Sequence, residues 1–385
     1  MDYYKTMMRY KNRDKELRMK NLHFNPPSAN RGVQTPPAVE TVQFDELCRV
    51  DYNGMIASID YLEFTVFNMD YALVIQNVLG LALTDFEDTG RGGGGYPNMS
   101  QATFGDVRVL HGSRNPDIMG IHVTIPGDGC RALFSRVMPS ELIRNILEFG
   151  CKVTRVDLAL DNIGDIYFYP YEIKQFVHDG LVKSRWRTFE IAQTCSMQSA
   201  VLTGDTVYLG SRTSDLFCRC YDKTLERVFR GHDKDLPEHW VRWELVCKDD
   251  RAQVACEQLL SSDFAIGEIV SGVLANYFSV LEENPLDSHK DRWPLNKRWE
   301  RFLGDVKPIR LFRVLKAERT LEDVADWIKK QCAPSLSALL RVYGFDWMEK
   351  EIGLNAWRIN KQLAALTVAE AERIELERQK NKAFY

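Results

Sequence analysis

Several segments of this chain alternate apolar and polar side chains with a period of two. The clearest are residues 152–161, 215–223 and 239–247, with shorter examples at 121–125 and 206–212. This period is that of a β-strand with one face on a hydrophobic core and the other in contact with water. The polar faces carry ionisable side chains in mid-strand, so we expect a sheet with one wet face and any chemistry on that face.

Helical patterns lie between these strands. The order strand, helix, hairpin, helix occurs twice, beginning at Ser58 and at Thr154, with Asp60 and Asp157 in similar places. The pattern predicts an α+β fold with a mainly antiparallel sheet and helices on one face, and it suggests two pseudo-repeated halves. The helices are expected at residues 71–83, 139–150, 170–180 and 249–260.

Composition along the chain indicates four parts. Residues 1–45 are predicted to be a disordered basic arm, because residues 1–33 carry eight Lys or Arg against three Asp or Glu. The arm could contact DNA phosphates or serve only as a solubilising tail. We expect the α+β domain at 55–282, a polar connection at 283–309 and a helical region at 310–385.

Bulk charge and cysteine content limit the class of protein. The formal net charge is −4, so binding to nucleic acid would need a local basic patch. The nine cysteines include no CxxC pair and indicate reduced thiols in the cytoplasm. No run of about 18 apolar residues predicts a membrane span, and the first residues do not form a signal peptide.

The strand at 215–223 carries the candidate nucleophile. Tyr221 shares a face with Arg219 and Lys223, two places to either side. A tyrosine hydroxyl is a weak nucleophile at its usual pKa of about 10, and neighbouring cations favour the phenolate and hold an anionic substrate. The functional interpretation is therefore that Tyr221 attacks a phosphodiester, assisted by Arg219 and Lys223. The alternative is an ordinary aromatic residue on a half-buried strand.

Carboxylates on the neighbouring strands suggest a metal site. Asp157, Asp161 and Glu244 lie on polar faces, as does His122 on another strand. Carboxylate oxygens suit Mg²⁺ or Mn²⁺, which would polarise the scissile phosphate and lower the pKa of the tyrosine. The alternatives are ion pairs on an open sheet for the carboxylates and a structural role for the histidine.

Basic side chains on these strands could bind DNA. Trp186 and Phe189 interleave with basic residues on one segment, a pattern suited to a single strand. The same segment could equally be an edge strand kept soluble by charge. The predicted DNA-binding residues of the strands are Arg155, Lys183, Arg185, Arg187 and Arg242.

Five motifs, taken in order, resemble the replication initiation factor family. They are IDYLEFT, IHVTIPGDGCRAL, VTRVDLALD, TVYLGSR followed by CRCYDK, and VRWEL. The family includes rolling-circle initiators of plasmids, replication proteins of filamentous phages and nicking relaxases of conjugative elements. The resemblance covers roughly residues 55–345.

The resemblance implies a rolling-circle replication initiator. Such an enzyme nicks one origin strand, and its tyrosine, here Tyr221, becomes attached to the 5′ phosphate and later helps to rejoin the strands. The metal would be held most naturally by Asp157 and Glu244, and Ser211 and Arg212 would contact the substrate strand. Expected partners are origin DNA and a host polymerase, together with a host helicase because the chain has no Walker motif. A homodimer is also implied, although no coiled-coil heptads point to one.

Two other functions are compatible with the same residues. One is a non-catalytic, sequence-specific DNA-binding replication or repressor protein on the same fold. The other is a metal phosphodiesterase that activates water with Asp157 and Glu244 and forms no covalent intermediate. A covalent protein–DNA adduct would distinguish the nicking enzyme from both.

Overall fold

The structure is a computed structural model that describes residues 50–231, 236–309 and 328–356, with a few further residues between 311 and 371. The chain divides into two compact units, residues 1–313 and 314–385. The predicted basic arm at 1–45 lies outside the described residues.

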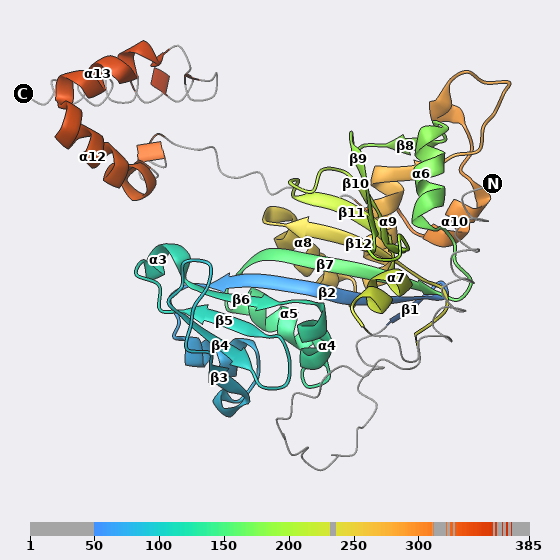
Figure 1. The fold of residues 1–385 in the computed structure, drawn as a ribbon, viewed down its shortest axis with the longest axis horizontal. Helices are drawn as coiled ribbons and strands as arrows, with labels where there is room; N and C mark the ends of the chain where they lie inside the picture. The colour runs from blue at the N-terminus through green and yellow to red at the C-terminus, as the bar shows by residue number, and fades with distance from the viewer. Residues whose placement is uncertain are drawn as a thin grey trace, which may run out of the picture. The chain divides into compact units, whose positions relative to one another are not determined.

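The first unit is built on one large antiparallel sheet of 11 strands (Figure 1). The order across the sheet is β3-β4-β5-β6-β2-β7-β12-β11-β10-β9, and β1 pairs with β2. The strands are β1 (Val50–Tyr52), β2 (Met55–Val66), β3 (Phe86–Asp88), β4 (Asn98–Ala102), β5 (Arg108–His111), β6 (Ile121–Ile125), β7 (Lys152–Ile163), β9 (Phe189–Cys195), β10 (Leu202–Leu209), β11 (Leu216–Asp222) and β12 (Trp240–Lys248). A separate two-stranded sheet pairs β8 (Val182–Ser184) with β13 (Phe278–Val280).

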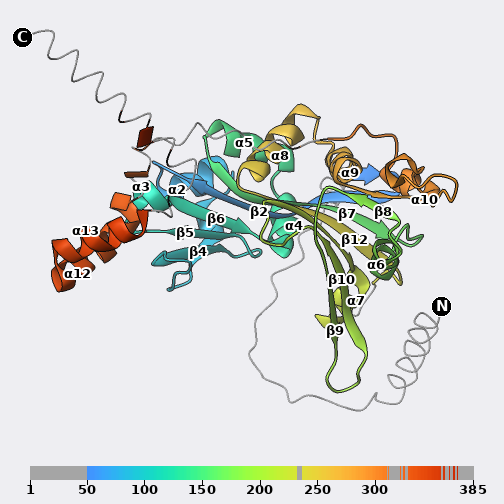
Figure 2. The same ribbon diagram turned by 90° about the horizontal axis from the view of Figure 1, so that it is seen from above.

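Helices cover the apolar face of the large sheet. Leu158 and Leu160 of β7 and Trp243 and Leu245 of β12 are fully buried on that face. The helices packed there are α5 (Pro139–Glu148), α8 (Asp250–Ser261) and α9 (Ile266–Tyr277) (Figure 2). At the polar face lie α4 (Gly127–Phe134) and α7 (Lys223–Phe229), and the unit also contains α2 (Tyr71–Leu73), η2 (Val74–Val78), η3 (Leu83–Asp85), α3 (Pro116–Met119) and α6 (Pro170–His178). The predicted α+β class with an antiparallel sheet is confirmed.

The two halves of the sheet are related by a pseudo-two-fold axis. Strands from the first half of the chain lie on one side of the central β2–β7 pair, and strands from the second half lie on the other. Each central strand has one β-bulge, where the extra residue is Asp60 in β2 and Thr154 in β7. The axis passes through the pair Leu62–Val156. Asp60 lies two places before Leu62, and Thr154 lies two places before Val156.

The bulges correct the predicted equivalence of Asp60 and Asp157. Counted from the axis, the counterpart of Asp157 is Glu63, and the counterpart of Asp60 is Thr154. A single extra residue in a strand changes the register of every later residue, and the period-two pattern alone does not show where that extra residue is inserted.

Two predicted segments differ in the structure. The helical segment expected at 71–83 ends near Val78, because Gly80 has a φ of 68° and turns the chain. Residues 283–309 are more than a polar connection, since they contain η4 (Lys290–Arg292) and α10 (Lys297–Leu303). Trp299 and Phe302 of α10 are fully buried against Trp243 of the sheet.

The second unit is helical where the structure describes it. Its elements are η5 (Ile328–Cys332), α12 (Ala333–Tyr343) and α13 (Phe345–Leu354). None of the helices in the described part of the chain is long and apolar enough to cross a membrane.

Candidate active site

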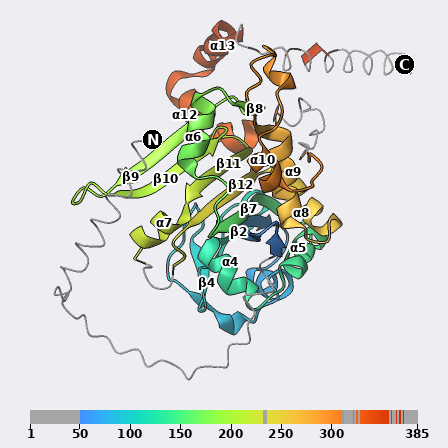
Figure 3. The same ribbon diagram turned by 90° about the vertical axis from the view of Figure 1, so that its right-hand side faces the viewer.

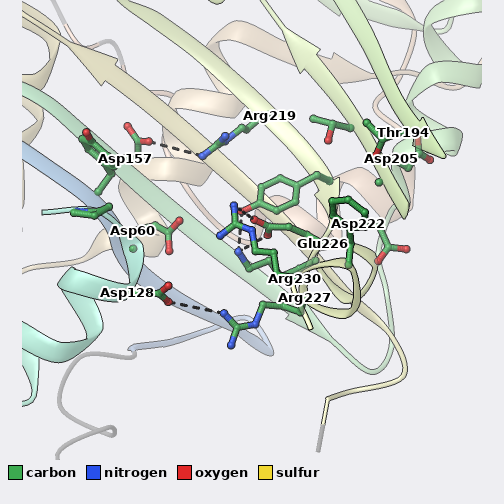
Figure 4. Close-up of a pocket in the computed structure, with 18 of the residues that line it drawn as sticks. Asp60, Asp128, Asp157, Thr194, Asp205, Arg219, Asp222, Glu226, Arg227 and Arg230 are labelled. Atoms are coloured by element: carbon green, nitrogen blue, oxygen red, sulfur yellow. Dashed lines mark hydrogen bonds and ion pairs between the residues drawn. The ribbon is translucent and has the colours of Figure 1, made fainter. Parts of the chain in front are cut away.

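A pocket of about 590 Å³ opens on the polar face of the sheet at β7 and β11 (Figure 4). Its floor is formed by the side chains of β7 and β11, its two walls by α4 with α7 and by the β9–β10 hairpin. The predicted polar faces of β7 and β11 therefore meet here, and the pocket is lined by Tyr221, Arg219, Lys223 and Asp157.

Tyr221 lies at the bottom of this pocket. Strand pairing places it opposite Arg242 of β12, and Arg219 opposite Glu244. The tyrosine is 7% exposed, and its hydroxyl donates a hydrogen bond to Glu244 Oε2 at 3.1 Å. Lys223 Nζ donates to the same hydroxyl at 3.4 Å. The hydroxyl therefore has both a proton acceptor and a cation within reach.

Electrostatics keep the tyrosine protonated in the resting protein. Burial and the charge of Glu244 raise the pKa of Tyr221 well above its ordinary value, despite the opposing effect of Arg242. Burial and Arg242 lower the pKa of Lys223, although its ion pair with Glu226 at 2.5 Å acts in the other direction. Tyr221 could therefore become a nucleophile only with transfer of its proton or with added positive charge.

Asp157 and Glu244 form a buried pair of carboxylates beside Tyr221. Both are 0% exposed. Arg155 binds Asp157 through two hydrogen bonds of 2.8 and 2.6 Å, and Arg219 bonds to Glu244 and lies 4.0 Å from Asp157. Burial and the neighbouring charge of Glu244 raise the pKa of Asp157 to about 8, although Arg155 opposes the shift. Burial and Glu244 thus favour the protonated form of this carboxyl even beside Arg155.

A divalent metal would find a partial set of ligands here. Among the described residues, no three His, Cys, Asp or Glu side chains group closely enough to form a complete metal centre. Asp157 and Glu244 do provide two hard oxygen donors of the kind that Mg²⁺ and Mn²⁺ prefer.

The lining of the pocket also favours an added cation. It contributes seven carboxyl groups but only five basic side chains. The carboxylates belong to Asp60, Asp106, Asp128, Asp157, Asp205, Asp222 and Glu226, and the basic groups to Arg131, Arg219, Lys223, Arg227 and Arg230.

Asp161 and Arg242 form a structural network instead of a free metal ligand and a free DNA contact. Arg242 is 3% exposed and binds Asp161 through two hydrogen bonds of 2.7 and 2.6 Å. It also bonds to Asp60, while the indole of Trp240 donates to Asp161 at 2.6 Å. Burial raises the pKa of Asp60, but Arg242 and Lys223 outweigh burial and lower it. The predicted DNA contact by Arg242 is not available on this buried side chain.

His122 lies far from Tyr221. It is four strands away from Tyr221 across the sheet, which is about 19 Å. The two residues also lie at different positions along the strands, because strand pairing aligns His122 with Lys152 of β7 and Tyr221 with Asp161 of β7. Its imidazole contacts Thr65 Oγ1 at 3.0 Å and Glu63 Oε1 at 3.4 Å. In the pseudo-symmetry of the sheet, His122 occupies in the first half the position that Glu244 occupies in the second.

The other predicted DNA-binding residues are dispersed. Arg155 stacks over Tyr61 and holds Asp157, next to the pocket. Ser211 and Arg212 lie in the exposed turn between β10 and β11, where Arg212 pairs with Glu190. The exposed Lys183, Arg185 and Arg187 belong to β8 and the segment after it, outside the lining of the pocket.

The sequence patterns did not reveal the basic wall of the pocket. Arg131 of α4 and Arg227 of α7 converge on Asp128, and Arg230 pairs with Glu226 at 2.9 Å (Figure 4). A short helix after the YDK motif, with Lys223 and Arg227 four places apart, was the available signal. Asp222 begins this helix by accepting a hydrogen bond from the Leu225 amide at 2.9 Å.

The antiparallel sheet thus brings a tyrosine, carboxylates and arginines together in one pocket. The Replication initiation factor family matches residues 151–355, and the Rolling Circle replication initiation protein N-terminal domain matches residues 56–144. The chain therefore belongs to the replication initiation factor family.

Individual relatives agree with this assignment. The chain is 26% identical to a putative DNA relaxase NicK of Bacillus subtilis, over 82% of this chain and 87% of the relative. It also resembles the structure of a rolling circle replication initiator protein from Geobacillus stearothermophilus. That match has a TM-score of 0.57 and 30% identity, and it covers 68% of this chain and all of the other.

Proposed function

We propose that this protein is a DNA-nicking and strand-rejoining enzyme that initiates rolling-circle replication through Tyr221. The observation that carries the proposal is the hydroxyl of Tyr221, which lies in an open pocket between an acceptor, Glu244, and a cation, Lys223. The relatives named above act as an initiator and a putative relaxase.

The chemistry is built on these contacts. The Tyr221 oxygen attacks phosphorus as its proton passes to Glu244, and the bond from phosphorus to the 3′ oxygen breaks. The leaving 3′ oxygen takes a proton from water, and the 5′ phosphate stays on the tyrosine. Arg219 and Lys223 stabilise the negative charge on the phosphate and on the developing phenolate. Reversal with a new 3′ hydroxyl rejoins the strand without ATP.

A bound Mg²⁺ or Mn²⁺ would be held by Asp157 and Glu244 and would supply positive charge for the phosphate. The buried carboxylate pair and the excess of acidic groups in the pocket support this proposal. Its test is a titration of the purified protein with Mn²⁺, followed calorimetrically. We expect Asp157→Asn to weaken Mn²⁺ binding at least tenfold, whereas Asp161→Asn should leave it within about twofold.

The origin sequence is to be found by selection. The protein is incubated with a pool of random single-stranded 40-mers and Mn²⁺, and strands that stay attached under denaturing conditions are sequenced. Tyr221→Phe should yield no attached strand yet bind the selected sequence with an affinity within about threefold of the parent. Tyr208→Phe, on the adjacent strand β10, is the matched control and should retain the adduct.

Other outcomes would select the alternative functions. Cleavage with a free 5′ phosphate and no adduct would indicate a water-activating phosphodiesterase. Tight binding without cleavage, in Mg²⁺ and in Mn²⁺, would indicate a non-catalytic DNA-binding protein. Adduct formation by Tyr221→Phe would show that another residue is the nucleophile.

A further inference from the structure

The β9–β10 hairpin extends beyond the rest of the large sheet (Figures 2 and 3). Residues 206–209 of β10 pair with both β9 and β11, whereas residues 202–205 pair with β9 alone. The outer part is therefore a free two-stranded ribbon, and residues 196–201 form the hairpin tip. Two-stranded ribbons of this type enter the major or the minor groove of DNA.

The base of this ribbon forms a wall of the pocket that contains Tyr221. Thr194, Thr203, Gly204 and Thr206 line the pocket, and Thr206 lies opposite Tyr221 in the pairing of β10 with β11. DNA bound in this pocket would therefore contact the base of the ribbon. Leu202, the last residue of β10 before the tip, is four residues from Thr206, a distance of about 14 Å along the strand. This length corresponds to about four base-pair steps of a duplex.

The chemistry of the ribbon differs from that of the opposite wall. Residues 191–204 include no Asp, Glu, Lys or Arg, and Asp205 is the charged side chain of the ribbon that lines the pocket, whereas α7 and the residue after it present Lys223, Arg227 and Arg230 together with Glu226. Arginine and lysine side chains bind phosphates, and uncharged polar and apolar side chains contact bases. The two walls are thus suited to a strand whose backbone faces α7 and whose bases face the hairpin.

Met197 is the most exposed apolar side chain of the tip. Its side chain is 100% exposed, and it is flanked by Ser196, Gln198 and Ser199. The tip is held by its own backbone, because the Ser196 amide donates to Val201 at 2.9 Å and the Ala200 amide donates to Ser196 at 2.8 Å. Apolar side chains of this kind, methionine among them, are inserted between base steps by proteins that unstack and kink DNA.

We propose that the hairpin tip is a strand-separating element that inserts Met197 between base pairs of the duplex four or more steps from the nick site. Its partner is origin DNA in duplex form, and the unpaired strand it releases enters the pocket. The inference rests on the proposed nicking function, since it explains how a strand of a duplex reaches a tyrosine at the bottom of a pocket.

The test compares three substrates that carry the selected sequence. They are a single strand, a negatively supercoiled plasmid, and a linear duplex with four mismatched base pairs beside the nick site. Met197→Ser should nick the plasmid at least tenfold more slowly than the parent, and should cut the single strand and the mismatched duplex within twofold of it. Leu286→Ser is the matched control, because Leu286 is 96% exposed in a loop that does not line the pocket.

Each other result overturns the inference. Nicking of the plasmid by Met197→Ser within twofold of the parent would show that the tip does not open the duplex. Equal losses on all three substrates would show a general effect on the site instead. If the parent formed no adduct even with the single strand, the proposed function itself would fail, and the role of the tip would fail with it.

Discussion

Replacement of Arg242 by Met tests whether the centre of the polar face is a structural ion network. The guanidinium is 3% exposed and is bonded to Asp161 and Asp60. Met keeps much of the volume but removes all of these bonds. Asp161, itself 5% exposed, would keep only the bond from the indole of Trp240.

The expected cost comes from the buried charge left behind. Removal of one partner from a buried ion pair costs about 3–5 kcal/mol, because the other charge stays buried without compensation. The bond from Trp240 compensates part of this, so we expect about 3 kcal/mol, which is more than a hundredfold in the folding equilibrium. With a urea dependence of about 1–3 kcal/mol per molar, the unfolding midpoint should fall by about 1 M or more.

The assay is urea unfolding followed by tryptophan fluorescence at pH 7 and again at acid pH. The pKa of Asp60 is lowered in the folded protein, so the stability from its pairing is present above the unfolded pKa and is lost as the pH falls through the folded value. The deficit of Arg242→Met should therefore shrink below about pH 4. Arg212→Met is the control, since its exposed ion pair with Glu190 should contribute less than about 1 kcal/mol. A deficit for Arg242→Met no larger than that of the control would refute the network.

Three further variants test other parts of the structure. The pKa of Asp157 is raised to about 8. The stability that its neutral carboxyl contributes is therefore complete below about pH 4 and is lost as the pH rises toward 8. Without metal, the urea unfolding midpoint of the parent should fall over this pH range relative to that of Asp157→Asn. His122→Ala should leave adduct formation within twofold of the parent and should cost about 1 kcal/mol in urea unfolding, because it removes the bond to Thr65 but nothing near the pocket. Trp299→Ala should lower the free energy of unfolding by about 3–5 kcal/mol, because Trp299 of α10 is fully buried in the core. A variant that unfolds like the parent would show that residues 283–309 only connect the two parts of the chain.

The sequence was sufficient for the sheet and for the side chains that face the same way. Alternation in β7, β11 and β12 assigned Tyr221, Arg219, Asp157 and Glu244 to one face, and the structure brings these four together. Their pairing partners could not be read in the same way. Which arginine neutralises which carboxylate depends on the order of strands across the sheet, and Arg242 meets Asp161 only because β12 lies beside β7.

The pseudo-two-fold axis explains why His122 resembled a member of the site. It occupies the position of Glu244 in the other half of the sheet, so its strand has the same pattern of polar and apolar faces. The equivalence fails where the proposed chemistry takes place. Leu110 pairs with His122 in the first half, where Arg219 pairs with Glu244 in the second, so Leu110 is the counterpart of Arg219. Two residues further along, the counterpart of Tyr221 is Gly112. A period-two pattern reports which face a residue occupies, but not in which half of the sheet it lies.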